Sequence, residues 1–271
     1  MKVDKNKDLL LSYMSMAPLA LALERYLEAR IYRTLPIVSP VLDIGCGEGL
    51  FAHLVFDSPL DTGIDPNAHE IKRARQLNGY EELIVCSGSQ VPKPDASYQT
   101  IICNSVLEHI PNIGSVLKEI HRLLAPGGSF YMTVPAPEFE KYTVGNSLLT
   151  AVGLHQWAKG YRAFCSKVLW KQMHYKSLEE WKGFVQAQGF KVVEGFSYDS
   201  RKICLMNDFF YPFSLFSVIV KKITNRWVLF PCFRSILIYP LFQLLKGVLN
   251  KDIRAEDGGL VFLSLKKAGP C

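Results

Sequence analysis

Hydrophobic residues between about positions 40 and 134 fall alternately into short continuous runs and into stripes with helical spacing. The runs predict buried strands, and the stripes predict helices that cover a sheet. Strands are expected at 40–45, 60–64, 82–86, 98–104 and 129–134. Helices are expected at 17–32, 67–77 and 113–124. Because strands that alternate with helices at this spacing form a parallel sheet covered on both faces, the pattern predicts a doubly wound α/β fold.

The pattern changes after Pro135. Residues 136–176 show no clear periodicity, and Ser177 with Glu180 then forms a capping box that opens another helix. Further strands are expected at 190–198 and 259–265, and the aromatic-rich insertion between them is interpreted as a helical cap. The expected organisation is an N-terminal helical segment, a sheet-bearing core, the cap, and a final strand with a tail, at residues 1–37, 38–198, 199–258 and 259–271.

Charge and cysteine usage narrow the possible partners. The formal net charge is +6, but Lys and Arg are spread along the chain, so no nucleic-acid partner is predicted. None of the seven cysteines forms a C-x-x-C pair, and no His, Asp and Cys cluster has metal-ligand spacing, so no metal is predicted. Cysteines inside apolar runs favour a reducing, cytoplasmic compartment.

The N-terminus superficially resembles a secretory signal, because Lys2, Lys5 and Lys7 precede an apolar run at 9–23. An amphipathic helix is favoured instead, since acidic residues interrupt the basic region. Its apolar face carries, at helical spacing, Leu19, Leu23, Tyr26 and Leu27. Its polar face carries Glu24, Arg25 and Glu28.

A glycine-rich loop follows the first core strand. Gly45, Gly47 and Gly49 lack a Cβ, so backbone N–H groups of this loop can approach a ligand closely. The dinucleotide fingerprint G-x-G-x-x-G requires a small residue at position 50, where this chain has Leu50. A nicotinamide-dependent oxidoreductase is therefore disfavoured.

Two acidic residues flank this loop in the predicted fold. Asp65 ends the second strand, where a carboxylate can accept hydrogen bonds from both hydroxyls of an adenosyl ribose. Asp43 lies two residues before Gly45 and can orient the loop and face a positive group of the ligand. The structural alternatives are a turn-stabilising side chain for Asp43 and, for Asp65, an Asx turn with Pro66.

Four motifs in this order and spacing resemble those of class I S-adenosylmethionine-dependent methyltransferases, in the subgroup similar to the ubiquinone-biosynthesis enzymes. The motifs are Leu42–Gly49, Asp65, Val106–Ile110 and Leu123–Gly128. The resemblance covers roughly residues 38–135 and implies a seven-stranded, mostly parallel sheet with an antiparallel last strand. It also implies that S-adenosylmethionine lies over the carboxyl ends of the first strands.

The resemblance further implies a set of cofactor-binding residues. Gly45, Cys46, Gly47 and Gly49 would approach the amino-acid part of the cofactor together with Asp43. Asp65 and Pro66 would lie at the ribose, and Asn104 beside the transferable methyl group. Where many relatives have an acid that binds the adenine amino group, this chain has Ser87, which weakens the expectation of adenine contact there.

Methyl transfer from a sulfonium mainly requires alignment of acceptor and methyl, and a general base only if the acceptor loses a proton. His109, after the fourth strand, is the first candidate for such a base, and His174, just before the capping box, is the second. The alternative for His109 is architectural, with Glu108 and His109 holding the loop to the following helix. His121 is expected to face away from the site.

The cap at 199–258 is the best, though indirect, indication of the acceptor. Its longest uncharged stretches, 209–220 and 235–245, are too short to span a bilayer. Apolar segments with basic flanks can instead lie in a membrane interface or cover the active site, so peripheral membrane contact through 209–246 is an alternative to a purely cytoplasmic protein. We expect a small hydrophobic or lipid-like acceptor. A polar metabolite, a cap that forms only a core or an oligomer interface, and a non-catalytic cofactor-binding scaffold stay open, as does the oligomeric state.

Overall fold

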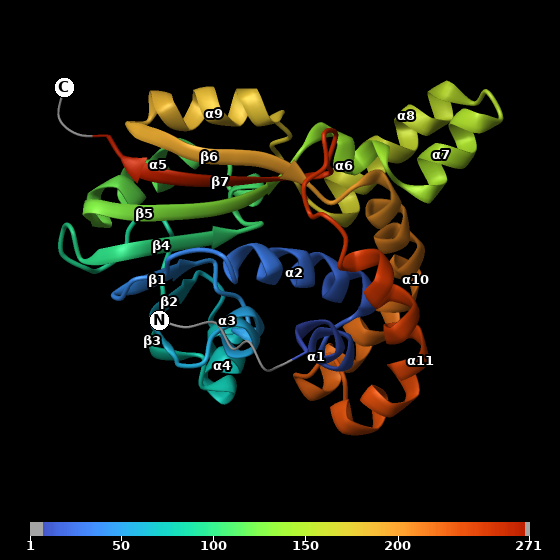
Figure 1. Cartoon of the computed structure of the whole chain (residues 1–271), viewed down its shortest axis with the longest axis horizontal. Helices are drawn as coiled ribbons and strands as arrows, with labels where there is room; N and C mark the ends of the chain where they lie inside the picture. Colours follow the sequence, from blue (N-terminus) through green and yellow to red (C-terminus); the bar gives the residue numbers. More distant parts are fainter. Residues whose placement is uncertain (1–7, 269–271) are drawn as a thin grey trace.

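Seven strands form a single sheet in the order β3-β2-β1-β4-β5-β7-β6 (Figure 1). The computed structural model describes residues 8–268 of the chain. The strands are β1 (Val41–Ile44), β2 (Leu60–Asp65), β3 (Tyr80–Val85), β4 (Tyr98–Asn104), β5 (Leu124–Pro135), β6 (Phe190–Tyr198) and β7 (Leu260–Lys267). β7 lies antiparallel between β5 and β6, and the other pairings are parallel. The predicted mostly parallel seven-stranded sheet with an antiparallel last strand is confirmed.

Helices cover both faces of this sheet and also extend beyond the carboxyl ends of its parallel strands. The helices of the described chain are α1 (Leu9–Met16), α2 (Leu19–Tyr32), α3 (Leu50–Val55), α4 (Ala68–Ala74), α5 (Ile113–Leu123), α6 (Pro137–Lys141), α7 (Val144–Ala151), α8 (His155–Phe164), α9 (Leu178–Ala187), α10 (Arg201–Thr224) and α11 (Pro231–Leu249). α1 to α4 contribute to a hydrophobic core on one face, and α5 and α9 to a second core on the other. The apolar stripe of α5 is buried as predicted, and the Ser177–Glu180 capping box begins α9.

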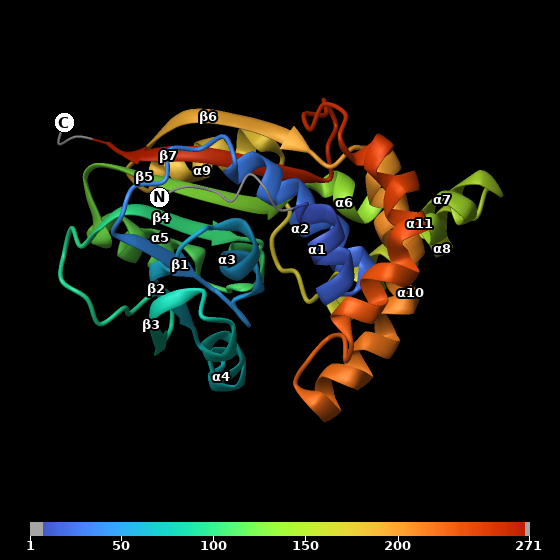
Figure 2. The same ribbon diagram turned by 60° about the horizontal axis from the view of Figure 1, so that its bottom comes forward.

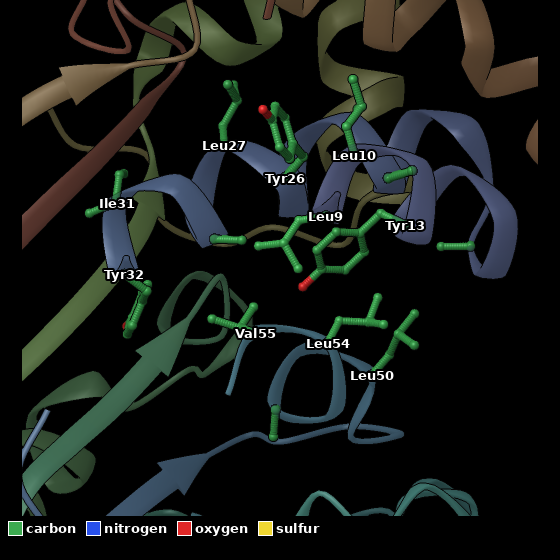
Figure 3. Packing of buried hydrophobic residues seen from close by; sticks show 14 of the residues in the cluster. Leu9, Leu10, Tyr13, Tyr26, Leu27, Ile31, Tyr32, Leu50, Leu54 and Val55 are labelled. Atoms are coloured by element: carbon green, nitrogen blue, oxygen red, sulfur yellow. The ribbon is translucent and has the colours of Figure 1, made fainter. Parts of the chain in front are cut away.

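The N-terminal segment folds differently from the prediction. The helix expected from residue 17 begins at Leu19, and a separate helix, α1, precedes it. Leu9 and Tyr13 of α1 point toward Leu54 and Val55 of α3 (Figure 3). This burial stabilises α1. The serines at positions 12 and 15 interrupt the apolar run and obscured the helix in the sequence, but their hydroxyls donate hydrogen bonds to the backbone carbonyls four residues earlier. Lys2, Lys5 and Lys7, on which the comparison with a secretory signal rested, lie outside the described residues.

Residues 136–176, in which no periodicity was found, are largely helical. They form α6, α7, α8 and a π-helical turn at Cys165–Leu169. α7 and α8 pack mainly on each other, beside α10, and keep much apolar surface exposed (Figure 1). The helices α6, α7 and α8 have only 5, 8 and 10 residues, so each has too few turns for a repeating pattern to stand out in the sequence.

The insertion forms a hairpin of two long helices, α10 and α11, beyond the carboxyl ends of the parallel strands (Figure 2). α10 packs on α2, and α11 packs on α1. At 24 and 19 residues, both helices are long and apolar enough to cross a membrane by length and composition alone. The helices continue through charged residues beyond the uncharged stretches, which is why the sequence suggested shorter apolar segments.

The cap joins the sheet at an unusual residue. Asp199, between β6 and α10, has a left-handed backbone with φ of 63° and is fully buried. Neither of its carboxylate oxygens has a hydrogen-bond partner in the part of the chain that the structure describes. Burial raises the pKa of this carboxyl to about 8. Its ionised form is therefore disfavoured in the folded protein.

We expect Asp199→Asn to stabilise the protein at alkaline pH. Because the pKa of Asp199 is higher in the folded than in the unfolded state, its carboxyl contributes to the free energy of unfolding. This contribution is fully present below about pH 4 and is lost as pH rises through about 8. Asn is neutral, similar in shape and tolerates positive φ. The melting temperature of the variant should exceed that of the parent by at least about 3 °C at pH 9 and approach it at pH 5. An equal difference at both pH values would contradict a titrating Asp199.

Candidate functional site

Two cavities adjoin each other at the carboxyl edge of the sheet. The first, of about 210 Å³, lies between the glycine loop and the N-terminal helices, and Lys221 of the cap closes one side. Six of the residues predicted to bind the cofactor line it: Asp43, Gly45, Cys46, Gly47, Gly49 and Asn104. Asp65, Pro66 and Ser87 are not part of this lining.

The glycine loop owes its shape to backbone conformation. Gly45, Gly47 and Gly49 have φ values of 73°, 53° and 79°, which side chains with a Cβ rarely adopt. A Cβ on Gly45 would also come within 2.5 Å of Val106 Cγ2. The N–H groups of Gly45 and Cys46 donate to the Ile64 carbonyl at 2.8 and 2.9 Å. The loop uses these two N–H groups to attach itself to β2, and contact of the loop residues with the cofactor stays a prediction.

Asp65 organises the same loop. Its Oδ2 accepts a hydrogen bond from the Gly47 N–H at 3.1 Å, and its Oδ1 accepts one from the Asn67 N–H at 2.8 Å. The second bond is the Asx turn considered as the structural alternative. Partial burial raises the pKa of Asp65, while Pro66 and Ser87 nearby are exposed. Ribose contact at Asp65 and adenine contact at Ser87 stay predictions.

Asp43, the next-to-last residue of β1, and Asn104, the last residue of the neighbouring strand β4, line the first cavity. Asp43 is buried and accepts a hydrogen bond from the Tyr80 hydroxyl at 2.6 Å, and burial raises its pKa to about 7. Asn104 Oδ1 accepts one from the Tyr32 hydroxyl at 2.7 Å. Asn104 Nδ2, which is buried, has no partner among residues 8–268. An unpaired amide donor beside a glycine loop fits a polar cofactor that supplies an acceptor there.

An ion pair between the partly exposed Arg25 and the buried Glu28 lies where this cavity adjoins the second one. Arg25 Nη1 lies 2.5 Å from Glu28 Oε2, and Glu28 Oε1 accepts hydrogen bonds from Thr133 Oγ1 at 2.8 Å and Ser105 Oγ at 3.0 Å. The sequence placed Arg25 and Glu28 on the polar face of an amphipathic helix. That face is turned toward the sheet, and the side chains on it form a site that sequence reasoning missed.

The second cavity has a volume of about 240 Å³ and is bounded by α2, α6, α10 and the 3-10 turn at Leu107–His109. Arg25 and Leu21 line both cavities. Two buried polar side chains line the second cavity with atoms that have no partner within the described chain: Glu108 Oε2, and both side-chain polar atoms of Asn207. Burial raises the pKa of Glu108 to about 8.

The two candidate histidines are placed differently. His109 lines the second cavity, with Nε2 3.8 Å from Glu108 Oε1 and Nδ1 3.2 Å from the Lys171 carbonyl. His174 contacts the Ile110 carbonyl through Nε2 at 3.1 Å and is not part of the cavity lining. A catalytic role for either stays a prediction. His121 contacts Gly189 and Phe190 at the far end of β6, away from both cavities, as expected.

The cap also contacts the cofactor loop. Lys221 Nζ lies 3.1 Å from Glu48 Oε2 and 3.2 Å from Glu70 Oε1. The indole N–H of Trp227 donates to Glu48 Oε1, and Lys221 Nζ lies 4.0 Å from the Trp227 ring centroid. The hairpin tip is thus attached to the glycine loop by charge and by a hydrogen bond. Glu48 was named in no sequence prediction because its partner is about 170 residues away along the chain.

Comparison with known proteins identifies the class. Residues 18–195 match the family model described as a methyltransferase domain, so the protein belongs to this methyltransferase domain family. The match and the fold confirm the predicted class, a class I S-adenosylmethionine-dependent methyltransferase, with S-adenosylmethionine as its cofactor.

The individual relatives are distant. The mitochondrial ubiquinone biosynthesis O-methyltransferase of Rattus norvegicus is 27% identical over 139 residues, covering 44% of this chain and 39% of the relative. The Bordetella avium ubiquinone biosynthesis O-methyltransferase is 34% identical over 95 residues, covering 32% of this chain and 39% of the relative. The chain spans less than half the length of the curated relatives it matches.

Solved structures share the fold. A SAM-dependent methyltransferase from Thermotoga maritima has a TM-score of 0.55 at 15% identity and covers 92% of this chain and 91% of its own. A phosphoethanolamine N-methyltransferase from Haemonchus contortus, in complex with phosphomonomethylethanolamine and S-adenosylhomocysteine, has a TM-score of 0.52 at 15% identity. It covers 93% of this chain and 54% of its own.

We expect Gly45→Ala to weaken S-adenosylmethionine binding by at least about tenfold, because the new Cβ would clash with Val106 and strain a residue with positive φ. Isothermal titration calorimetry measures the effect. Gly127→Ala is the matched control, since Gly127 has a similar φ of 76° in open space away from the site. Equal losses of affinity in both variants would mean that general strain, not the loop, is responsible.

Proposed function

We propose that this protein transfers the methyl group of S-adenosylmethionine to a small, mainly apolar acceptor that carries one polar reacting group and binds in the second cavity. The observation that carries this proposal is the pair of adjoining cavities. The first cavity is lined by the glycine loop and Asn104. The second cavity shares Arg25 and Leu21 with the first. A two-substrate transfer needs adjacent sites of this kind, because the reacting atoms must approach to near-attack distance.

The lining of the second cavity supports an acceptor with an apolar body. Four aromatic side chains contribute to it: Phe139, Tyr142, Trp170 and Tyr211. Aromatic walls of this kind favour flat or hydrophobic ligands. The unpaired atoms of Glu108 and Asn207 supply, in the same cavity, hydrogen-bonding groups for one polar function of the acceptor.

Bound S-adenosylmethionine supplies an electrophilic methyl group on a positively charged sulfur. The residues of the chain bind and align the acceptor, exclude water, and remove a proton if the nucleophile carries one. Glu108 is protonated at neutral pH because burial raises its pKa to about 8. It therefore donates a hydrogen bond to the acceptor at pH 7 and becomes able to accept a proton as pH rises. His109 lies next to it, toward the exposed rim of the cavity.

Incubation of the purified protein with methyl-labelled S-adenosylmethionine and an extract of its host tests the function directly. We expect label in the organic fraction, because the acceptor is apolar. Gly45→Ala serves as the control for dependence on the cofactor site and should lower the labelling. Label in the aqueous or protein fraction would keep the transfer and refute the acceptor class. Tight cofactor binding without any labelled product would refute transfer and favour a cofactor-binding scaffold.

The pH dependence of the labelling reaction tests Glu108. We expect kcat/KM of the parent to rise with pH through about 8, where the carboxyl ionises, and Glu108→Gln to lose this rise. Glu81→Gln, an exposed residue of β3, is the matched control and should keep the parental profile. A Glu108→Gln variant that is slower by the same factor at every pH would show that Glu108 only supports the loop.

A further inference from the structure

The cap presents an apolar face that nothing in the described chain covers. Along α10, Phe213, Phe216 and Ile223 recur at intervals of three and seven residues and lie on its outer side. Along α11, Phe233, Leu237 and Leu244 do the same at intervals of four and seven. These six side chains are between 61% and 76% exposed. Two adjacent stripes of this kind form a patch that monomeric proteins seldom leave in water.

The charge of the hairpin favours one kind of partner. Residues 201–251 contain eight Lys or Arg residues and a single acid, Asp208. The cations lie toward the two ends of the hairpin, with Arg201, Lys202 and Lys251 exposed at one end and Lys222 and Arg226 exposed at the other. An apolar stripe between basic ends matches the acyl boundary and the anionic headgroups of a lipid surface.

The packing of the hairpin on the N-terminal helices limits the orientation in which it can bind a bilayer. By length and composition α10 and α11 could span a bilayer, but the longest uncharged stretch of α10, 209–220, is shorter than the about 20 apolar residues that a spanning helix ordinarily has. The inner sides of both helices are buried against α2 and α1, whose apolar residues form part of the core. Insertion across a bilayer would expose that core. The helices can therefore present only their outer faces, lying parallel to the membrane surface.

We propose that the outer face of the α10–α11 hairpin binds peripherally to an anionic lipid surface. Phe213, Phe216, Leu237 and Leu244 enter the interface, and Lys222 and Arg226 contact the headgroups. The proposal goes beyond the methyl transfer proposed above and does not depend on it. The same hairpin contributes Asn207 to the second cavity and Lys221 to the first, so the site lies directly behind the bound surface.

Flotation with lipid vesicles tests the proposal without any activity measurement. The purified chain is mixed with vesicles of phosphatidylcholine alone or with about one third phosphatidylserine. We expect binding to the anionic vesicles and weak binding to the neutral ones. The triple variant Phe216→Ser, Leu237→Ser, Leu244→Ser should lower the partition coefficient by at least about a hundredfold, because three apolar side chains no longer leave water. Lys222→Glu with Arg226→Glu should abolish the preference for anionic vesicles.

The control variant replaces three apolar residues elsewhere that are 49% to 56% exposed: Val38→Ser, Val85→Ser and Val193→Ser, which should leave vesicle binding unchanged. Circular dichroism checks that every variant is folded. Failure of the parent to bind anionic vesicles would overturn the proposal. Undiminished binding by the triple serine variant of the cap, called the cap variant below, would also overturn it. A dimer seen by sedimentation velocity, lost in the cap variant while vesicles never bind, would assign the face to a second copy. Protein that resists extraction by alkaline carbonate would refute peripheral binding.

Discussion

The buried carboxylate of Glu28 holds together the part of the molecule on which both cavities depend. It accepts hydrogen bonds from Ser105, after β4, and from Thr133 of β5, and it pairs with Arg25 one helical turn away. A charge without solvent exposure is tolerated only when it is fully paired, so these contacts fix the position of α2 over the strand ends. α2 in turn supplies the wall between the two cavities. α1 and α10 pack against α2, and α11 packs against α1.

The cap belongs to the site as much as the sheet does. It provides Lys221 to the first cavity and Asn207, Asp208 and Tyr211 to the second. Its tip is held to the cofactor loop through Glu48. A division of the chain into a cofactor-binding core and a separate insertion therefore describes the sequence order better than it describes the site, which is assembled from both.

Local patterns account for what the sequence could predict. The individual strands, the stripe of α5, the capping box and the glycine loop each depend on residues close together in the chain, and each was found at or near its predicted position. Arg25 and Glu28 were recognised only as part of a polar helix face, because the partners of Glu28, Ser105 and Thr133, are about 80 and 100 residues distant. The unpaired side-chain atoms of Asn207 and the left-handed backbone of Asp199 also depend on contacts between distant parts of the chain. No periodic pattern in the sequence predicts them.

Arg25 and Leu21 form a common wall, so the shapes of both cavities depend on the same two side chains. A ligand that orders this wall from one side changes the free energy of binding from the other, and such a change is equal in both directions. In the arrangement proposed above, with cofactor in one cavity and acceptor in the other, a movement of Arg25 or Leu21 that one ligand causes reaches the other site directly. A substitution at either position would alter both sites together.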